Sequence, residues 1–255
     1  MYKLGLKLWS VNTDFYYEEA KRLYSEGIFD YIELYVVPNT LDTLDKWKEL
    51  NIPFIIHAPH FAHGFNLAKK EKEFSNLEIY KEVKCFADQL KAPYIIFHGG
   101  IDGNISETAR QLANLHEPRA LIENKPYVAL PNKMGGNFCR GYNIEEIREV
   151  KNTANCGFCL DFGHAICAAN SLGLDVYEYC KRFLSFNPNM YHVTDLNDIT
   201  SPYDTHLHLG TGELDFNKVF DMIPNGSYIT FETTKDSKEN LNDFVKDMQW
   251  LKNLK

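Results

Sequence analysis

Short apolar runs, rich in β-branched and aromatic residues, recur along the chain and alternate with longer segments of mixed polarity. The runs are apolar at both odd and even positions, which is typical of strands that are covered on both faces. The pattern predicts eight strands, at residues 3–10, 31–37, 54–59, 94–100, 120–125, 157–164, 190–195 and 228–234.

Most of the segments between these runs carry apolar residues at the helical spacing of three and four, as residues 71–91 do. Glycine at the end of residues 15–27 is a helix stop signal. The predicted helices span residues 15–27, 41–50, 71–91, 105–116, 144–152, 174–185, 215–223 and 237–255. Strict alternation of strands and helices predicts an α/β fold with a parallel sheet, and eight strands are the number that closes a (β/α)8 TIM barrel. An open doubly wound sheet is the alternative.

The length of 255 residues suits one such barrel, because barrels of this type run to about 250 residues as a single unit. No tract rich in proline, glycine and serine and no block of like charges divides the chain. We therefore expect residues 1–255 to form a single TIM-barrel domain.

Composition places the chain among ordinary globular proteins, since hydrophobic residues make up 44% and charged residues 24%. No apolar run approaches the ~20 residues that cross a bilayer, and the N-terminal stretch lacks the layout of a signal peptide. We expect a cytoplasmic protein with no membrane partner. The net charge of −8 gives no general electrostatic footprint for nucleic acid, which is therefore the less favoured partner. The oligomeric state is not encoded in any pattern that we can interpret.

Six cysteines are scattered along the chain, far below the density of a disulfide-stabilised secreted fold. They are expected to be reduced. Cys156 and Cys159 form a CxxC pair, but no second pair accompanies them and an apolar strand begins there. Buried core thiols are the favoured interpretation, and a structural zinc site is the alternative.

Titratable residues gather where the predicted strands end, which is the face of a TIM barrel that carries the chemistry. These residues are His57, His60, His98, Glu123, Asp161, His164, His192, Asp195 and Glu232. Carboxylates that point at one axial space would repel one another unless cations neutralised them. The joint pattern therefore predicts a divalent metal centre on the barrel axis. Oxygen and imidazole ligands suit zinc, manganese, cobalt or iron.

Residues 203–212, YDTHLHLGTG, hold three further potential ligands at a spacing of two. On an extended backbone Asp204, His206 and His208 would all point the same way, because side chains alternate between faces. The stretch therefore predicts either a ligand cluster or the polar face of an edge strand.

Several runs at these strand ends resemble the motifs of the xylose-isomerase-like TIM barrels, which include endonuclease IV and the sugar isomerases and epimerases. The similar runs are IIHAPH, IIFHGG, LIENK, CLDFGHA, MYHVTD, DTHLHLGTG and ITFET, in the expected order from about residue 30 to residue 234.

The endonuclease IV branch of this superfamily binds three zinc ions through nine ligands, and all nine positions are filled here by the expected residue types. The resemblance implies a first ion bound by His57, His98, Glu123 and Glu232, a second shared by both glutamates with Asp161 and His192, and a third bound by His164, Asp204 and His206. In that interpretation His208 is only a neighbour.

The sugar isomerase and epimerase branch shares a smaller set of residues. The resemblance implies one divalent metal held by Glu123, Asp161, His192 and Glu232. Glu123 and Glu232 would be the catalytic pair, acting on opposite faces of the sugar, or a metal-polarised hydride shift would occur, and His164 would contact substrate. Glu33 resembles a strand-2 glutamate that is common among the small-sugar members.

The sequence departs from each branch at one place. The stretch after the second strand has no arginine or lysine before Lys46, where an endonuclease would carry a basic loop for phosphate contacts. Asp198 stands where the ketose 3-epimerases have an arginine.

We expect a divalent-metal-dependent isomerase or epimerase of a small sugar or sugar phosphate, with one to three ions, zinc foremost and manganese or cobalt as alternatives. An endonuclease-IV-like trinuclear zinc phosphodiesterase of DNA repair is the second hypothesis, and a non-catalytic sugar-binding or metal-binding barrel is the third.

Further residues are expected around the substrate. His60, Lys125 and Trp9 are candidates for substrate binding. The segment 127–143 is long for a barrel loop and contains Lys133 and Arg140, so it is a candidate lid with an anion site.

Overall fold

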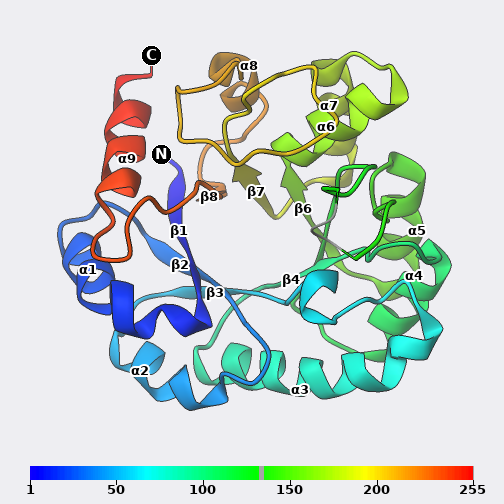
Figure 1. Cartoon of the computed structure of the whole chain (residues 1–255), viewed down its shortest axis with the longest axis horizontal. Coiled ribbons are helices and arrows are strands. Elements are labelled where there is room, and N and C mark those ends of the chain that lie inside the picture. The colour runs from blue at the N-terminus through cyan, green and yellow to red at the C-terminus, as the bar shows by residue number, and fades with distance from the viewer. Residues whose placement is uncertain (132–134, 255) are drawn as a thin grey trace.

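The computed structural model of the chain describes residues 1–131 and 135–254. Eight parallel strands pair in chain order, and the last pairs with the first, so that the sheet closes into a barrel (Figure 1). The strands are β1 (Lys3–Trp9), β2 (Tyr31–Tyr35), β3 (Phe54–His57), β4 (Ile95–His98), β5 (Ala120–Glu123), β6 (Gly157–Asp161), β7 (Met190–Val193) and β8 (Tyr228–Phe231). The predicted (β/α)8 TIM barrel is confirmed.

Nine α-helices in the described residues surround the barrel (Figure 1). They are α1 (Thr13–Ser25), α2 (Leu44–Glu49), α3 (Glu73–Gln89), α4 (Ile105–Asn114), α5 (Ile144–Ala154), α6 (Phe162–Leu172), α7 (Val176–Phe183), α8 (Phe216–Phe220) and α9 (Asn242–Asn253). Five short 3-10 turns accompany them: η1 (Ser10–Asn12), η2 (Leu41–Thr43), η3 (Phe61–His63), η4 (Lys70–Lys72) and η5 (Leu184–Phe186).

Helix α6 was not predicted, and its first turn was assigned to the sixth strand. The strand ends at Asp161, whose side chain accepts a hydrogen bond from the backbone N–H of His164 and so caps the helix. The sequence pattern concealed this boundary because α6 is apolar nearly all round, and a continuously buried helix has no polar stripe. His164 therefore lies one turn inside a helix rather than at a strand end.

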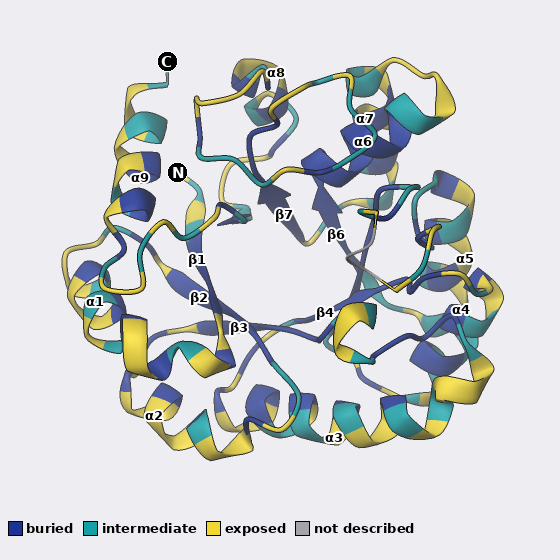
Figure 2. Cartoon of the chain, in the orientation of Figure 1, coloured by how far each residue is buried: buried dark blue, intermediate teal, exposed yellow. Residues whose placement is uncertain are grey.

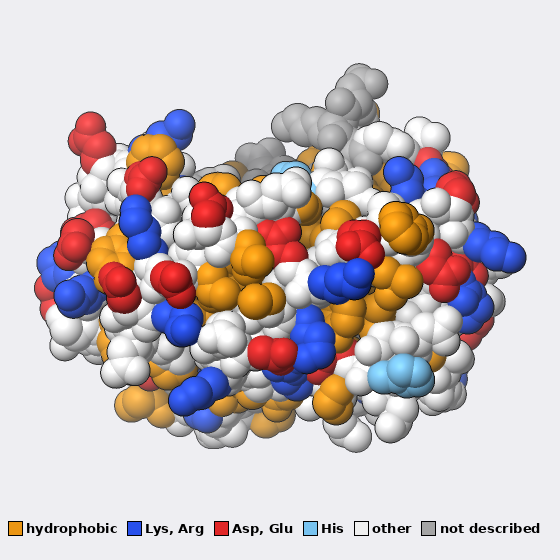
Figure 3. Space-filling view, turned by 90° about the horizontal axis from the view of Figure 1, so that it is seen from below, with side chains coloured by type: hydrophobic (Ala, Val, Ile, Leu, Met, Phe, Trp, Pro, Cys, Tyr) orange, Lys and Arg blue, Asp and Glu red, His pale blue; other side chains and the backbone are white. Residues whose placement is uncertain are grey.

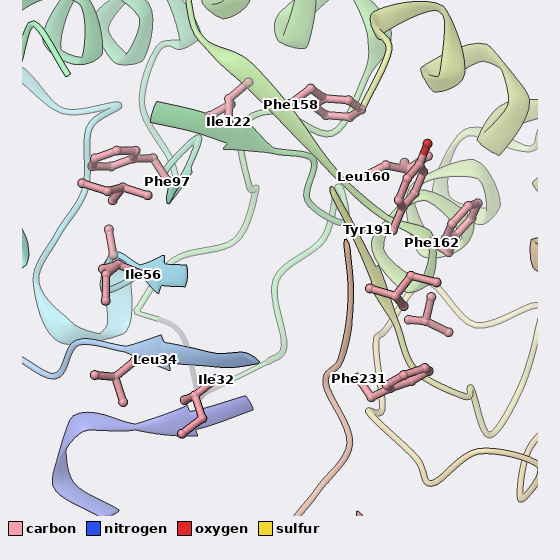
Figure 4. Packing of buried hydrophobic residues seen from close by; sticks show 14 of the residues in the cluster. Ile32, Leu34, Ile56, Phe97, Ile122, Phe158, Leu160, Phe162, Tyr191 and Phe231 are labelled. Carbon is pink, nitrogen blue, oxygen red and sulfur yellow. The ribbon is translucent and has the colours of Figure 1, made fainter. Parts of the chain in front are cut away.

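Side chains alternate strictly between the two faces of the barrel wall. Figure 4 shows Ile32, Leu34, Ile56, Phe97 and Phe231 on the outer side of the strands, where they belong to the main hydrophobic core. The helices cover this layer with their buried faces, while their outer faces are exposed (Figure 2). The barrel wall is thus held by apolar packing on its outside, which leaves its inner positions available for other chemistry.

The floor of the barrel interior is a separate apolar cluster. It consists of Tyr31, Ile55, Ile96, Leu121, Cys159 and Met190. Gly5, the partner of Tyr31 in the register, leaves room for the tyrosine ring, because a Cβ there would lie 2.4 Å from Tyr31 Cζ. The Tyr31 hydroxyl reaches across to Thr230 Oγ1 at 2.8 Å. This floor closes one end of the barrel and supports the inward residues above it.

On the face in Figure 3, charged side chains of both signs surround several groups of apolar side chains. Within the described residues, no helix combines the length and the apolar character that a bilayer crossing requires. All six cysteines are free thiols, and Cys156 and Cys159 belong to none of the metal-ligand groups found among these residues.

Candidate metal centre

The eight inward positions next above the floor are all polar. They hold Lys7, Glu33, His57, His98, Glu123, Asp161, His192 and Glu232, from eight different strands or strand ends. Neighbouring strands bring these side chains together in pairs: His98 lies beside Glu123 in the register, and Asp161 lies beside His192. One residue per strand, repeated around a closed barrel, produces a ring of titratable groups on the axis.

The ring is fixed by hydrogen bonds to the backbone behind it. The Asn124 side chain accepts from Asp161 N at 2.8 Å and donates to Asp161 O at 2.8 Å, which locks the end of β5 to the end of β6. Asn124 has no exposed surface, so its role is to brace these two strand ends.

Five groups of side chains among the described residues have the geometry for a metal ion, and within each group the donor atoms lie within 4.8 Å of one another. Three of them consist only of predicted ligands: His57–His98–Glu123, Glu123–Asp161–His192 and His164–Asp204–His206. The other two are Glu33–His57–Glu232, which contains the ninth predicted ligand, and His208–Asp236–Asp243. All nine predicted ligands therefore belong to potential metal-binding groups.

The Glu123–Asp161–His192 group, extended by Glu232, is the most acidic. We call these four residues the central group. His192 Nδ1 lies 3.2 Å from Glu232 Oε1, 3.7 Å from Glu123 Oε2 and 3.8 Å from Asp161 Oδ2. His192 Nδ1 and Asp161 Oδ2 are both buried and have no hydrogen-bond partner among the described residues. A buried polar atom normally has a partner, so two unpartnered atoms in a group that contains three carboxylates fit a bound cation.

The first group is built on one carboxylate oxygen. Glu123 Oε2 lies 3.2 Å from His57 Nε2 and 3.0 Å from His98 Nε2. Burial lowers the pKa of both imidazoles below the ordinary histidine value, well below it for His98. Their neutral forms are the ones that can bind a metal ion.

The third group, His164–Asp204–His206, joins α6 to the loop before α8. Asp204 Oδ2 lies 2.8 Å from His206 Nε2 and 3.2 Å from His164 Nε2. The prediction of an extended backbone is wrong here, because His206 has a φ of 50° in the left-handed region. The reversal turns His208 away to Asp247 and Asp236, at 3.0 and 3.1 Å, so the three side chains do not share one face.

Two buried lysines, one of them unexpected, lie among the carboxylates. Lys7 donates to Glu232 Oε1 at 2.6 Å and also to Glu33 Oε1. Lys125 Nζ lies 3.4 Å from Glu123 Oε1 and 3.2 Å from His164 Nε2. The sequence did carry a signal for Lys7, since it is the one charged residue between Gly5 and Trp9 on the inward face of an apolar strand.

The charges of the ring set its protonation. Burial opposes ionisation, yet Lys7 and His192 hold the pKa of Glu232 well below its usual range, and Lys125 does the same for Glu123. Asp161 behaves in the opposite way. Burial raises the pKa of Asp161 to about 6, and the carboxylates of Glu232 and Glu123 add to the rise while His164 opposes it. Glu123 and Glu232 are thus ionised beside cationic neighbours, whereas Asp161 is the carboxyl group whose ionisation the surrounding carboxylates oppose.

A cavity of about 260 Å³ opens directly onto these groups. Four residues predicted to bind substrate, Trp9, His60, Lys125 and His164, line it. Glu232, Asp204 and His206 line it as well. Its remaining wall is mostly apolar and includes Tyr35, Phe61, Pro126, Val128, Ala129, Leu130 and Cys139. Tyr35, which lies at the inward position after Glu33 on β2, was not singled out from the sequence.

Glu33, the fifth residue predicted to bind substrate, is fully buried and is not part of the cavity wall. It accepts hydrogen bonds from Lys7 and from Thr230 Oγ1 at 2.6 Å, and it lies 2.8 Å from His192 Nε2. Burial opposes its ionisation, but His192 and Lys7 lower the pKa of Glu33 to about 2. These contacts suit the orientation of His192 better than a substrate contact.

Part of the segment 127–143 covers the cavity, but its predicted anion site does not form among the described residues. Arg140 donates to Gly103 O at 2.7 Å and pairs with Glu146 at 3.4 Å, away from the cavity. Lys133 lies outside the described residues. Asp195, another strand-end candidate, accepts from the backbone of Leu196, Gly212 and Leu214 and braces that loop.

The donors of all three groups are imidazole and carboxylate, with no thiolate, which fits zinc, manganese, cobalt or iron. In the central group the unpartnered atoms of His192 and Asp161 support the same conclusion independently. In the third group Asp204 Oδ2 and His206 Nδ1 are likewise buried without a partner among the described residues, so they can accept a cation or a polar group of a substrate.

The family model for xylose isomerase-like TIM barrels matches residues 23–254 of this chain. A curated relative, the probable endonuclease 4 of Mycobacterium leprae (strain TN), is 21% identical over 215 residues, which are 82% of this chain and 84% of that protein. Two solved structures share the fold. A D-tagatose 3-epimerase-like protein has a TM-score of 0.73 at 20% identity, covering 98% of this chain and 96% of the other. The IOLI protein with a binding zinc atom has a TM-score of 0.65 at 15% identity, covering 97% and 96%.

Proposed function

Because the chain belongs to the family of xylose isomerase-like TIM barrels, we propose that it is a divalent-metal-dependent isomerase or epimerase of a small sugar or sugar phosphate. One observation carries the proposal: the acidic central group borders a small, mostly apolar cavity through Glu232. A monosaccharide-sized molecule in that cavity would lie against a metal ion and a carboxylate at once.

Glu123, Asp161, His192 and Glu232 are the residues that would hold the ion. A divalent ion there would act as a Lewis acid on a carbonyl or hydroxyl oxygen of the substrate. That chemistry suits epimerisation beside a carbonyl, which begins with the loss of a proton from the carbon next to the carbonyl group. It also suits aldose–ketose isomerisation, which proceeds by the same proton loss or by a metal-polarised hydride shift.

Glu232 is the residue placed to move this proton. Its side chain is 12% exposed and faces the cavity, whereas that of Glu123 has no exposed surface. The hydrogen bond from Lys7 orients Glu232 and favours its ionised, basic form. We therefore assign removal of the proton to Glu232, which is sufficient for isomerisation. Epimerisation also needs a group that returns a proton on the opposite face, and that role falls to Glu123 in addition to metal binding.

The remaining walls suit a sugar. Lys125 and His164 present nitrogen atoms to the cavity, and these would bind substrate oxygens. Trp9, Tyr35 and Phe61 offer aromatic surface for the C–H face of a sugar ring and exclude water from the reacting carbon.

A second candidate is an endonuclease-IV-like phosphodiesterase. The observation that favours it is the assembly of nine potential ligands in and around three groups, together with the curated relative named as a probable endonuclease 4. Among the described residues, however, no arginine lines the cavity, and the net charge of −8 disfavours a polyanionic substrate.

The proposal is tested by proton exchange. Purified protein loaded with Zn²⁺, Mn²⁺ or Co²⁺ is incubated in D2O with a panel of aldoses, ketoses and their phosphates, and deuterium entering a carbon position is followed by NMR. We expect exchange and product formation with at least one sugar. Glu232→Gln should reduce the rate by about 100-fold or more, as expected for loss of a general base.

A matched control is Glu239→Gln, which neutralises an exposed glutamate and should leave the rate unchanged. Cleavage of an oligonucleotide with one abasic site is measured in parallel. Cleavage that depends on Glu232, combined with no exchange in any sugar, would replace the proposed function by the second candidate.

A further inference from the structure

Lys125 occupies a position that brings its ammonium group into competition with a metal ion. It lies two residues after the end of β5, is 8% exposed, and lines the cavity. Its Nζ lies 3.2 Å from His164 Nε2, and that same nitrogen lies 3.2 Å from Asp204 Oδ2. His164 Nε2 is therefore the atom that would complete a metal site in the third group, and it already faces a cation.

The charges of the two groups differ accordingly. The third group contains one carboxylate, Asp204, and its Oδ2 is within 3.2 Å of both histidines of the group. The central group gathers three carboxylates around one imidazole. A divalent ion in the third group would meet the Lys125 charge at close range in a site with little water, where like charges repel strongly. A divalent ion in the central group would also lie near ammonium groups, because Lys125 Nζ is 3.4 Å from Glu123 Oε1 and Lys7 Nζ is 2.6 Å from Glu232 Oε1. There, however, the ion would be surrounded by three carboxylates rather than one, and it would relieve their mutual repulsion.

We propose that Lys125 takes the place of a third metal ion, so that the His164–Asp204–His206 group stays free of metal and binds an oxygen of the substrate. This inference rests on the metal-dependent sugar chemistry proposed above, and it adds a specific role for one residue. Lys125 and His164 then act together at the cavity wall, where an ammonium and an imidazole can both donate to a substrate hydroxyl, carboxylate or phosphate oxygen.

The test measures metal stoichiometry. The wild-type protein and Lys125→Met are stripped with a chelator and dialysed against a series of buffered free Zn²⁺ concentrations, and bound zinc is measured by elemental analysis. We expect Lys125→Met to bind one zinc ion more than the wild type at saturation, or to fill its weakest site at a free Zn²⁺ concentration at least tenfold lower. Adding His206→Ala to Lys125→Met should remove the gained ion, which identifies the third group as its site.

Two variants guard against a merely structural effect. Lys125→Arg retains the positive charge and should keep the wild-type stoichiometry. Lys235→Met removes a nearby ammonium that donates to Thr233 O and does not line the cavity, so its zinc binding should also match the wild type. Circular dichroism of each stripped variant checks that it is folded.

The proposal is overturned if Lys125→Met and the wild type bind zinc identically, or if the wild type already binds three ions. Those results leave the sugar chemistry to be judged by its own exchange assay. Conversely, a gained ion in Lys125→Met supports the role of Lys125 even if no sugar is turned over, in which case the proposed function alone fails.

Discussion

Lys7 Nζ donates a hydrogen bond to Glu232 Oε1 over 2.6 Å, which links the first strand of the barrel to the end of the last. The same ammonium pairs with Glu33, so one buried cation serves a fully buried carboxylate and a second that is 12% exposed. Burial disfavours its charge, but Glu232 and Glu33 raise the pKa of Lys7 above the ordinary lysine value. Lys7 is therefore an ammonium ion that positions the proposed base.

Removing this cation should destabilise the metal-free protein. Lys7→Met leaves Glu33 and Glu232 without their ammonium partner, and the loss of one member of a buried ion pair costs about 3–5 kcal/mol. The free energy of unfolding, measured by urea denaturation in the presence of a chelator, should fall by that amount. Lys7→Met combined with Glu33→Gln should recover part of the loss, since one of the uncompensated charges is gone. Equal stability of Lys7→Met and the wild type would refute this account of the ring.

Metal binding should stabilise the fold through the central group. An ion that binds only the native state stabilises it by about 2.7 kcal/mol when its free concentration is 100 times its Kd. Zinc should therefore raise the melting temperature of the stripped protein, and a chelator should reverse the rise. Asp161→Asn should diminish the zinc-induced shift because it removes a carboxylate from the group, whereas the exposed Asp42→Asn should not. A full shift in Asp161→Asn would place the stabilising ion elsewhere.

Much of this arrangement was predictable because successive side chains of a barrel strand point alternately inward and outward. Runs that are apolar on both faces predicted the eight strands, and the inward, strand-end positions of His57, His98 and Glu123 follow from alternation alone. The side-chain groups depend on register, which sets which neighbours meet. Register is not visible in a single sequence, although a closed barrel leaves few choices.

The errors have physical causes too. Helix α6 was not predicted because its surface is apolar nearly all round and shows no helical stripe. The left-handed backbone of His206 was not predicted because the identity of a single non-glycine residue does not specify a positive φ. Lys7 was overlooked because it stands within an apolar run, where its parity with Gly5 and Trp9 would have placed it inside the barrel. The role of a buried lysine depends on which carboxylates meet it across the barrel, and only the fold supplies that.

Away from the metal centre, Glu117 should make stability depend on pH. It accepts hydrogen bonds from Arg119 Nε at 2.7 Å and from the Tyr80 hydroxyl at 2.8 Å. Burial would raise the pKa of Glu117, but the bonds from Arg119 outweigh it, and the pKa lies below the ordinary glutamate value. A group with a lowered native pKa contributes stability above its unfolded value, about pH 4.3, and loses it as the pH falls through the native value.

Glu117→Gln should therefore be less stable than the wild type at neutral pH, and the difference should shrink as the pH falls below about 4.3. Urea denaturation at a series of pH values, with a chelator present throughout, measures the difference. A stability gap between the two proteins that stays constant down to pH 3 would show that the charge of Glu117 does not contribute.

The floor of the barrel offers a test of packing by a pair of substitutions. A Cβ on Gly5 would lie 2.4 Å from Tyr31 Cζ, and both residues are held by strand pairing, so the ring has to move. Gly5→Ala should lower the free energy of unfolding by about 1–3 kcal/mol, the usual cost of overpacking a core. Tyr31→Leu alone should also be destabilising, because it leaves a space and removes the hydrogen bond to Thr230. Together the two changes should cost less than the sum of their separate costs, since the smaller side chain admits the added methyl group.

Combining Gly5→Ala with Tyr94→Leu, which alters a different tyrosine packed against the same floor, should give simple additivity. Additivity in both pairs would mean that Gly5 is not required by the Tyr31 ring.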